Sequence, residues 1–234
     1  MEFMNTFRNI ILALLLLAPL AVFSKDRADL PKIAPVTKKD KKMLKSLDEK
    51  YTRKSAVKME VVKILKQNLL GRESKSSGNI TLSRGKLRLN FLKPDRSTVI
   101  VDKSNMWIVN YPPEEFEGAS LQVIQAKLNS GKGKSQGLIK MLVKGGLFKH
   151  FKAVGSIKEK GYRTFFLQPN KTTNEFKRAQ VSINKKGNKI LRLRYWDDLD
   201  NETIYEFSKI KFVDKVSKDT FSFTPPADAD ITVY

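Results

Sequence analysis

The stretch SSGNITLSRGKLRLNFLKPDRSTVIVDKSNMWIVNYPP, residues Ser76–Pro113, decides the fold of this chain. It holds four short extended runs, each closed by turn-forming residues. In Lys86–Phe91 the apolar residues occupy alternate positions, which predicts a strand with one buried face and one solvated face. Ser97–Val101 is apolar or β-branched on both faces, and Met106–Tyr111 ends at two prolines that cannot donate to a ladder. The stretch therefore predicts an antiparallel meander.

Extended runs with regular turns recur on both sides of this meander, at the spacing expected of an all-β sandwich or barrel. Before it, Val57, Met59 and Val61 alternate in a strand that starts at Ala56, and Asn68–Ser77 is rich in turn formers. The runs after it are Phe148–Ile157, Tyr162–Leu167, Phe176–Ile183, Lys189–Trp196 and Glu202–Phe212. Together they predict about eleven strands in one large, strongly curved sheet.

Two amphipathic or apolar segments predict helices. Lys39–Tyr51 carries apolar residues at helical spacing, and Thr37 precedes it as a candidate N-cap. Leu138–Val143 is almost wholly apolar and ends at two glycines. A helix this apolar must bury most of its surface, but its sequence does not distinguish permanent packing from a movable lid.

The N-terminus predicts export. Ile10–Phe23 is apolar but shorter than the ~20 residues that a membrane-spanning helix needs. With a short leading region and Ser24 at the end, it is typical of a secretory signal cleaved after residue 24, so that residues 1–24 are lost. Residues 25–37, with two prolines, are expected to be a flexible lead-in, and residues 38–234 a single soluble domain.

Composition argues against catalysis. The chain has no cysteine and one histidine, His150, and no spaced set of histidines or carboxylates. Thiol chemistry and metal sites therefore find no support, and we expect neither an enzyme nor a cofactor. A formal net charge of +21 favours anionic partners such as membrane surfaces or polyanions. The cations are spread along the chain, often on the polar side of alternating strands, so a solvated basic face is the simpler interpretation.

The order of the motifs resembles the periplasmic lipoprotein carrier (LolA) family. The resemblance begins with RGKLRLNFLKP at Arg84–Pro94 and continues through the two following strands, where the family has a proline after the arginine and a glycine at the position of Lys103. It ends with FSFTPPADADI at Phe221–Ile231, which is similar to the family's closing F-x-F-x-P-P-x-G-x-D-V, with Ala229 at the glycine position.

The resemblance implies a fold and a site. LolA-like proteins are unclosed antiparallel β-barrels covered by short helices, with a hydrophobic cavity inside that takes acyl chains. Periodicity alone leaves open whether the apolar stripe here is a filled core or a cavity wall, and most such residues are core. The family's arginine at the barrel mouth, which helps to hold the lid closed, corresponds to Arg84. The residues expected to line the acyl-chain cavity are Leu87, Leu89, Phe91, Val99, Val101, Trp107, Val109, Leu138, Met141 and Leu142.

The function that the resemblance implies is a monomeric periplasmic chaperone. It would accept lipoproteins from a lipoprotein-releasing ABC transporter of the inner membrane and deliver them to an outer-membrane acceptor, with transient contact with anionic membrane surfaces. Two alternatives stay open: a carrier or sensor for another lipid, and a basic exported protein that binds a polyanion such as lipopolysaccharide or nucleic acid. The second rests on the cations and aromatics interleaved in Lys189–Trp196, a pattern that amphipathic strands also produce.

Overall fold

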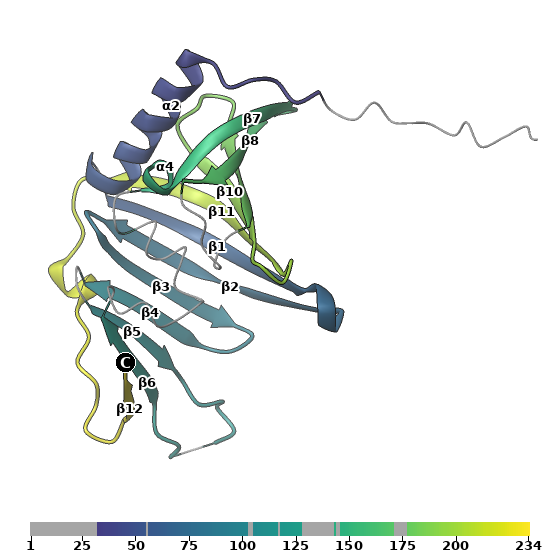
Figure 1. The fold of residues 1–234 in the computed structure, drawn as a ribbon. Helices are drawn as coiled ribbons and strands as arrows, with labels where there is room; N and C mark the ends of the chain where they lie inside the picture. The colour runs from purple at the N-terminus through teal and green to yellow at the C-terminus, as the bar shows by residue number, and fades with distance from the viewer. Residues whose placement is uncertain are drawn as a thin grey trace, which may run out of the picture. The chain divides into compact units, whose positions relative to one another are not determined.

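One 12-stranded sheet organises the part of the chain that the computed structural model describes, namely residues 32–54, 56–102, 105–116, 118–127, 143, 146–170 and 177–234. The strand order is β12-β6-β5-β4-β3-β2-β1-β11-β10-β9-β8-β7, with β12 and β7 at the two ends (Figure 1). Neighbouring strands are antiparallel, apart from the parallel pair β12–β6. The predicted mainly-β, unclosed barrel is confirmed.

The elements follow the chain in a simple order. The strands are β1 Ala56–Gln67, β2 Arg72–Ser83, β3 Lys86–Lys93, β4 Ser97–Asp102, β5 Asn105–Asn110, β6 Gln122–Lys127, β7 Phe151–Glu159, β8 Tyr162–Pro169, β9 Arg178–Asn184, β10 Ile190–Trp196, β11 Glu202–Val213 and β12 Asp230–Val233. The helical segments are α2 Lys38–Glu49, η1 Lys50–Lys54, η2 Asn68–Leu70, α4 Leu147–His150 and η4 Lys218–Phe221.

Two local predictions were wrong. The prediction of turns throughout Asn68–Ser77 holds only to Gly71. The polar residues that follow Gly71 belong to β2, which pairs with the whole length of β1, and this tertiary pairing overrides their weak strand propensity. The predicted strand at Phe148 starts instead with the helical turn α4. The predicted count of about eleven strands is close to the twelve observed. Strand β12 is only four exposed residues long and follows two prolines, so it has no alternating pattern to recognise.

Helix α2 begins where the sequence predicts. Thr37 and Asp40 form a capping box, in which the Thr37 hydroxyl accepts from the Asp40 N–H and the Asp40 carboxylate accepts from the Thr37 N–H. Leu44 and Leu47 are buried against the sheet, and after the helix Tyr51 accepts a hydrogen bond of 3.0 Å from the Ile190 N–H of β10. Burial raises the pKa of Tyr51 to about 12.

A buried ion pair fixes α2 to β8. Arg163 donates to both Asp40 carboxylate oxygens, at 3.0 Å for the Nη2–Oδ2 contact, and to the Ser156 hydroxyl oxygen at 2.7 Å. Asp40 and Ser156 are both buried. Burial raises the pKa of the Asp40 carboxyl, but the hydrogen bonds from Thr37 and Arg163 outweigh it and leave the pKa below its usual value.

We call the sheet face against which α2 packs the inner face. One continuous hydrophobic cluster joins the α2 leucines to inner-face residues of strands from β6 across the sheet to β7. Part of the predicted flexible lead-in also contacts the sheet, because Ala34 exchanges two backbone hydrogen bonds with Ser156 of β7. Among the described residues, no helix is both long and apolar enough to span a membrane.

Candidate functional site

The register of β3 and β4 brings five of the predicted cavity residues together on the inner face. Leu87 lies opposite Val101, and Leu89 lies opposite Val99, so all four side chains point to one side. Phe91 follows at the next inner position of β3 and is half-buried. The alternation in the sequence therefore predicted this surface correctly.

Trp107 and Val109 lie on the opposite, outer face. They pair with Ile100 and Thr98 of β4, whereas the inner positions of β5 hold Met106 and Ile108. The apolar run MWIVN offers an apolar residue to both faces, and only the register shows which residues point inward. The expectation that Trp107 and Val109 line an inner cavity is corrected by this geometry.

The outer face at β5 has its own cover, which explains its apolar residues. The chain after β11 crosses this face, where the Trp107 and Phe223 rings meet edge to face with centroids 5.6 Å apart. Phe221 of η4 is buried, η4 contacts β3 and β4, and Arg88 of β3 donates to the Thr220 carbonyl oxygen. The closing F-x-F motif thus packs a second, smaller core on the outer side.

The inner stripe is closed to solvent. Leu87 and Val101 are fully buried and Leu89 is 4% exposed, and all three belong to the cluster that includes the leucines of α2. Of the other predicted site residues, Leu138, Met141 and Leu142 lie outside the described residues. Whether the stripe contacts acyl chains therefore stays a prediction.

Arg84 lies exposed in the two-residue turn between β2 and β3. Arg84 and Gly85 both have positive φ angles, 44° and 80°, as the tightest hairpin turns require. A methyl group at Gly85 would stand 3.4 Å from the Val143 carbonyl oxygen, so this turn borders the buried residue Val143. The predicted contact between Arg84 and a lid stays a prediction.

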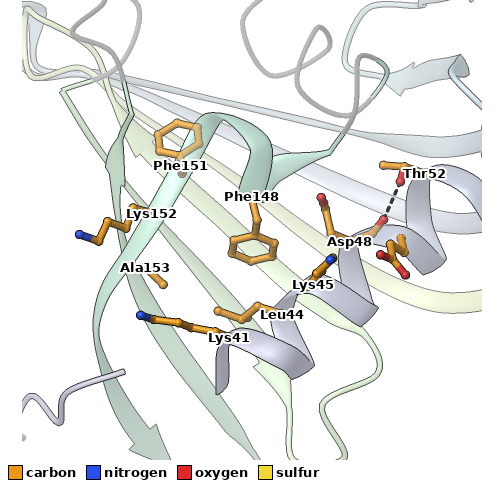
Figure 2. Close-up of a pocket in the computed structure, with 10 residues that line it drawn as sticks. Lys41, Leu44, Lys45, Asp48, Thr52, Phe148, Phe151, Lys152 and Ala153 are labelled. Atoms are coloured by element: carbon orange, nitrogen blue, oxygen red, sulfur yellow. Dashed lines mark hydrogen bonds between the residues drawn. The ribbon is translucent and has the colours of Figure 1, made fainter. Parts of the chain in front are cut away.

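A hollow of about 650 Å³ lies between α2 and the start of β7 (Figure 2). Its apolar lining comes from Leu44 of α2, Phe148 of α4, and Phe151 and Ala153 of β7. Phe148 projects from α4 toward Leu44, so the two helical elements face each other across the hollow. The volume is within the range of ~300–1,000 Å³ that is usual for small-molecule sites.

The wall of this hollow is held by a polar contact. The Asp48 carboxylate of α2 accepts a hydrogen bond of 2.8 Å from the Leu147 N–H, at the first residue of α4. Any side chain at Gly146 would collide with that carboxylate, because a Cβ there would stand 2.1 Å from Asp48 Oδ2. Asp48 therefore sets the distance between α2 and α4.

The margin of the hollow is charged. Lys41 and Lys45 of α2 and Lys152 of β7 line it and are exposed, and Asp48 and Glu49 of α2 line it as well. Within the described ranges, none of the three lysines forms an ion pair with a carboxylate. Apolar walls with charged groups at the mouth suit an amphiphile rather than a polar metabolite. Sequence reasoning missed Phe151 and Ala153, because this hollow exists only where α2 and β7 meet.

Comparisons with known proteins agree with one another. The profile of the family described as "Outer membrane lipoprotein carrier protein LolA" matches residues 65–224. A protein of Dechloromonas aromatica (strain RCB), named outer-membrane lipoprotein carrier protein, is 29% identical over 157 residues, which cover 67% of this chain and 71% of the relative.

A solved structure shows the same fold at low identity. An uncharacterised conserved protein of Thermus thermophilus superposes with a TM-score of 0.52 at 12% identity, and the match covers 84% of this chain and 99% of the Thermus chain. A LolA superfamily protein of Nitrosomonas europaea is similar with a TM-score of 0.43 at 10% identity, covering 78% and 97% of the two chains.

Proposed function

This chain belongs to the LolA family of outer membrane lipoprotein carriers, and on that premise we propose that it binds the acyl chains of lipoproteins and carries them between the two membranes. The match of the family profile across residues 65–224 is the observation that carries the proposal. The related carrier of Dechloromonas aromatica supports it. The family is one of carriers, which agrees with a chain that is not an enzyme.

The physical requirement for such a carrier is an apolar surface that water does not reach. Each buried CH₂ of an acyl chain is stabilised by ~0.8 kcal/mol, so a triacylated protein cannot cross water unprotected. The hollow lined by Leu44, Phe148, Phe151 and Ala153 offers apolar side chains from which a bound acyl chain would exclude water. We place at least one acyl chain there, with the stripe at Leu87 and Leu89 as the wall that would continue the site once a ligand entered.

The partners that fit this role are an inner-membrane ABC transporter that releases lipoproteins and an outer-membrane acceptor, with the chain acting as a monomer. The net charge of +21 would favour brief contact with anionic membrane surfaces. Export after cleavage at Ser24 would place the chain in the periplasm, as the N-terminal sequence predicts.

The rival role of polyanion binder is less well supported by the cations of β10. Arg192 pairs with Glu206 at 2.7 Å, and Arg194 pairs with Glu202 while also lying over the Trp196 ring, 4.8 Å from its centre. Cations already paired with carboxylates, and an indole already covered by a guanidinium, are poorly placed for phosphates and stacked bases. Nucleic acid is therefore not among the proposed partners.

Isolation of the native protein tests both export and cargo. Purified from the periplasmic fraction without detergent, it is expected to start at Lys25 and to carry masses that match acylated lipoproteins in intact-complex mass spectrometry. An uncleaved Met1 in the membrane fraction would contradict the export step. A periplasmic chain that carries only nucleic acid or lipopolysaccharide would favour the polyanion role.

A further inference from the structure

Lys63 of β1 points to the inner face of the sheet. The register from Ala56 to Gln67 is continuous against β2, so Lys63 follows Val57, Met59 and Val61 on the face that α2 covers. Its cross-strand neighbours are Ser76 of β2 and Tyr205 of β11. A lysine thus stands in the row that otherwise holds buried aliphatic side chains.

The side chain of Lys63 is partly shielded from water, and no counter-charge for it is found among the described residues. It is half-buried, and burial lowers the pKa of its amine. No carboxylate among the described residues lies within ion-pair distance of it. An ammonium taken from water without a partner costs free energy, which an anionic ligand would recover.

Other cations of the central strands are placed differently. Lys66, three residues along β1, lies on the outer face and contacts Glu202 and Glu73. Arg192 and Arg194 of β10 also face outward and pair with glutamates. The outer face therefore supplies its own counter-ions, and Lys63 is distinguished by its inner position.

The surroundings of Lys63 suit the head of an amphiphile. Tyr205 stacks on Tyr195 at 6.5 Å and on Phe207 at 6.4 Å, which makes an aromatic ladder with phenol groups on the inner face. Ser76 adds a hydroxyl on the other side of Lys63. From Lys63 the inner row of β1 continues through three apolar residues to Val57, about 20 Å away along an extended strand.

We infer that Lys63 anchors the anionic head group, phosphate or carboxylate, of an amphiphile whose tail would replace the contacts that now bury Val61, Met59 and Val57 on the inner face. This inference rests on the proposed function, since it requires that acyl chains enter the inner side of the sheet. It adds a preference for anionic lipids over neutral ones. The acyl moiety of a lipoprotein is recognised by apolar contact, whereas an anionic lipid also gains a charge-assisted hydrogen bond. The chain would then carry anionic single lipids in addition to lipoproteins.

The test compares probes that share a palmitoyl tail. Binding of monopalmitoyl glycerol (neutral), palmitate (carboxylate) and palmitoyl lysophosphatidate (phosphate) to the full chain is measured by calorimetry. The wild type is expected to bind the two anionic probes roughly tenfold more tightly than the neutral one, the effect of one charge-assisted hydrogen bond. The anionic probe that binds more tightly identifies the preferred head group. Inorganic phosphate alone is expected not to compete with either anionic probe.

Three variants assign the preference to this residue. Lys63→Met should abolish the preference for anionic probes without weakening binding of the neutral probe, and Lys63→Arg should retain the preference. Lys58→Met should leave all three affinities unchanged, because Lys58 is exposed on the outer side of the same strand. Thermal unfolding of each variant checks that the fold is kept, and removal of an unpaired inner cation is expected to leave the Tm unchanged or higher.

The outcomes separate this inference from the proposed function. Equal binding of neutral and anionic probes by the wild type, or an anionic preference that survives Lys63→Met, would overturn the role of Lys63 while leaving acyl binding intact. Displacement of palmitoyl lysophosphatidate by inorganic phosphate would overturn the assignment of a lipid. Failure of all three palmitoyl probes to bind would contradict the carrier function itself.

Discussion

Arg163→Met is expected to lower the free energy of unfolding by about 3 kcal/mol, because it leaves the Asp40 carboxylate buried without its cation. The Asp40 side chain is only 8% exposed, and among the described residues only Thr37 would still donate hydrogen bonds to it. The Ser156 hydroxyl, also buried, loses its donor in the same variant. Urea unfolding at neutral pH measures the effect.

The matched control is Arg192→Met. Arg192 contacts Glu206 at 2.7 Å, but the two side chains are 47% and 42% exposed, so solvent screens the pair. Its loss should cost less than ~1 kcal/mol. Equal destabilisation by the two substitutions would contradict the claim that the Asp40–Arg163 pair attaches α2 to the sheet.

The same pair has a pH signature. The depressed pKa of Asp40 means that its contribution to stability is present above the ordinary carboxyl pKa of ~4 and is lost as pH falls through the lower, folded value. Without Arg163, burial raises the pKa of Asp40, and protonation then relieves an unpaired charge. The wild type should therefore lose stability below pH ~4 more steeply than Arg163→Met does.

Ala153→Phe is expected to weaken binding of a dansyl-labelled fatty acid about tenfold or more, equivalent to at least ~1.4 kcal/mol. Ala153 lines the hollow between α2 and β7 and is half-buried there. A phenyl group at this position would occupy space that an acyl chain needs. Phenylalanine favours strands, so β7 should persist.

Val154→Phe serves as the control for this substitution. Val154 is the next residue of β7, is 50% exposed and does not line the hollow. The same added volume there should leave the affinity within about twofold of wild type. Normal binding by folded Ala153→Phe would show that the hollow is not part of the acyl site.

Much of this architecture could be predicted from local patterns. Alternation identified the inner residues of β3, and Thr37 before an amphipathic run identified the start of α2. Extending the alternation of Val57, Met59 and Val61 by one step would also have placed Lys63 on the inner face. Such signals are local, because side-chain direction follows directly from strand parity.

The remainder depends on contacts between distant segments. Trp107 was misplaced because β5 is apolar on both faces, and its outward direction follows from the cover by Phe223, more than a hundred residues later. Ala153 could not be recognised as a site residue, since nothing around it reveals that α2 lies opposite. A hollow is a property of how elements pack, and periodicity reports only which face of an element is apolar.

The most direct measurement of the central claim is release of lipoproteins from a membrane. Spheroplasts of a bacterium that lacks its own copy of this gene are labelled with radioactive palmitate and incubated with the purified chain. The account predicts that labelled lipoproteins move into the supernatant in a complex with the chain, and that Ala153→Phe releases far fewer. Labelled lipoproteins that stay in the pellet while the folded wild-type chain remains in the supernatant would contradict it.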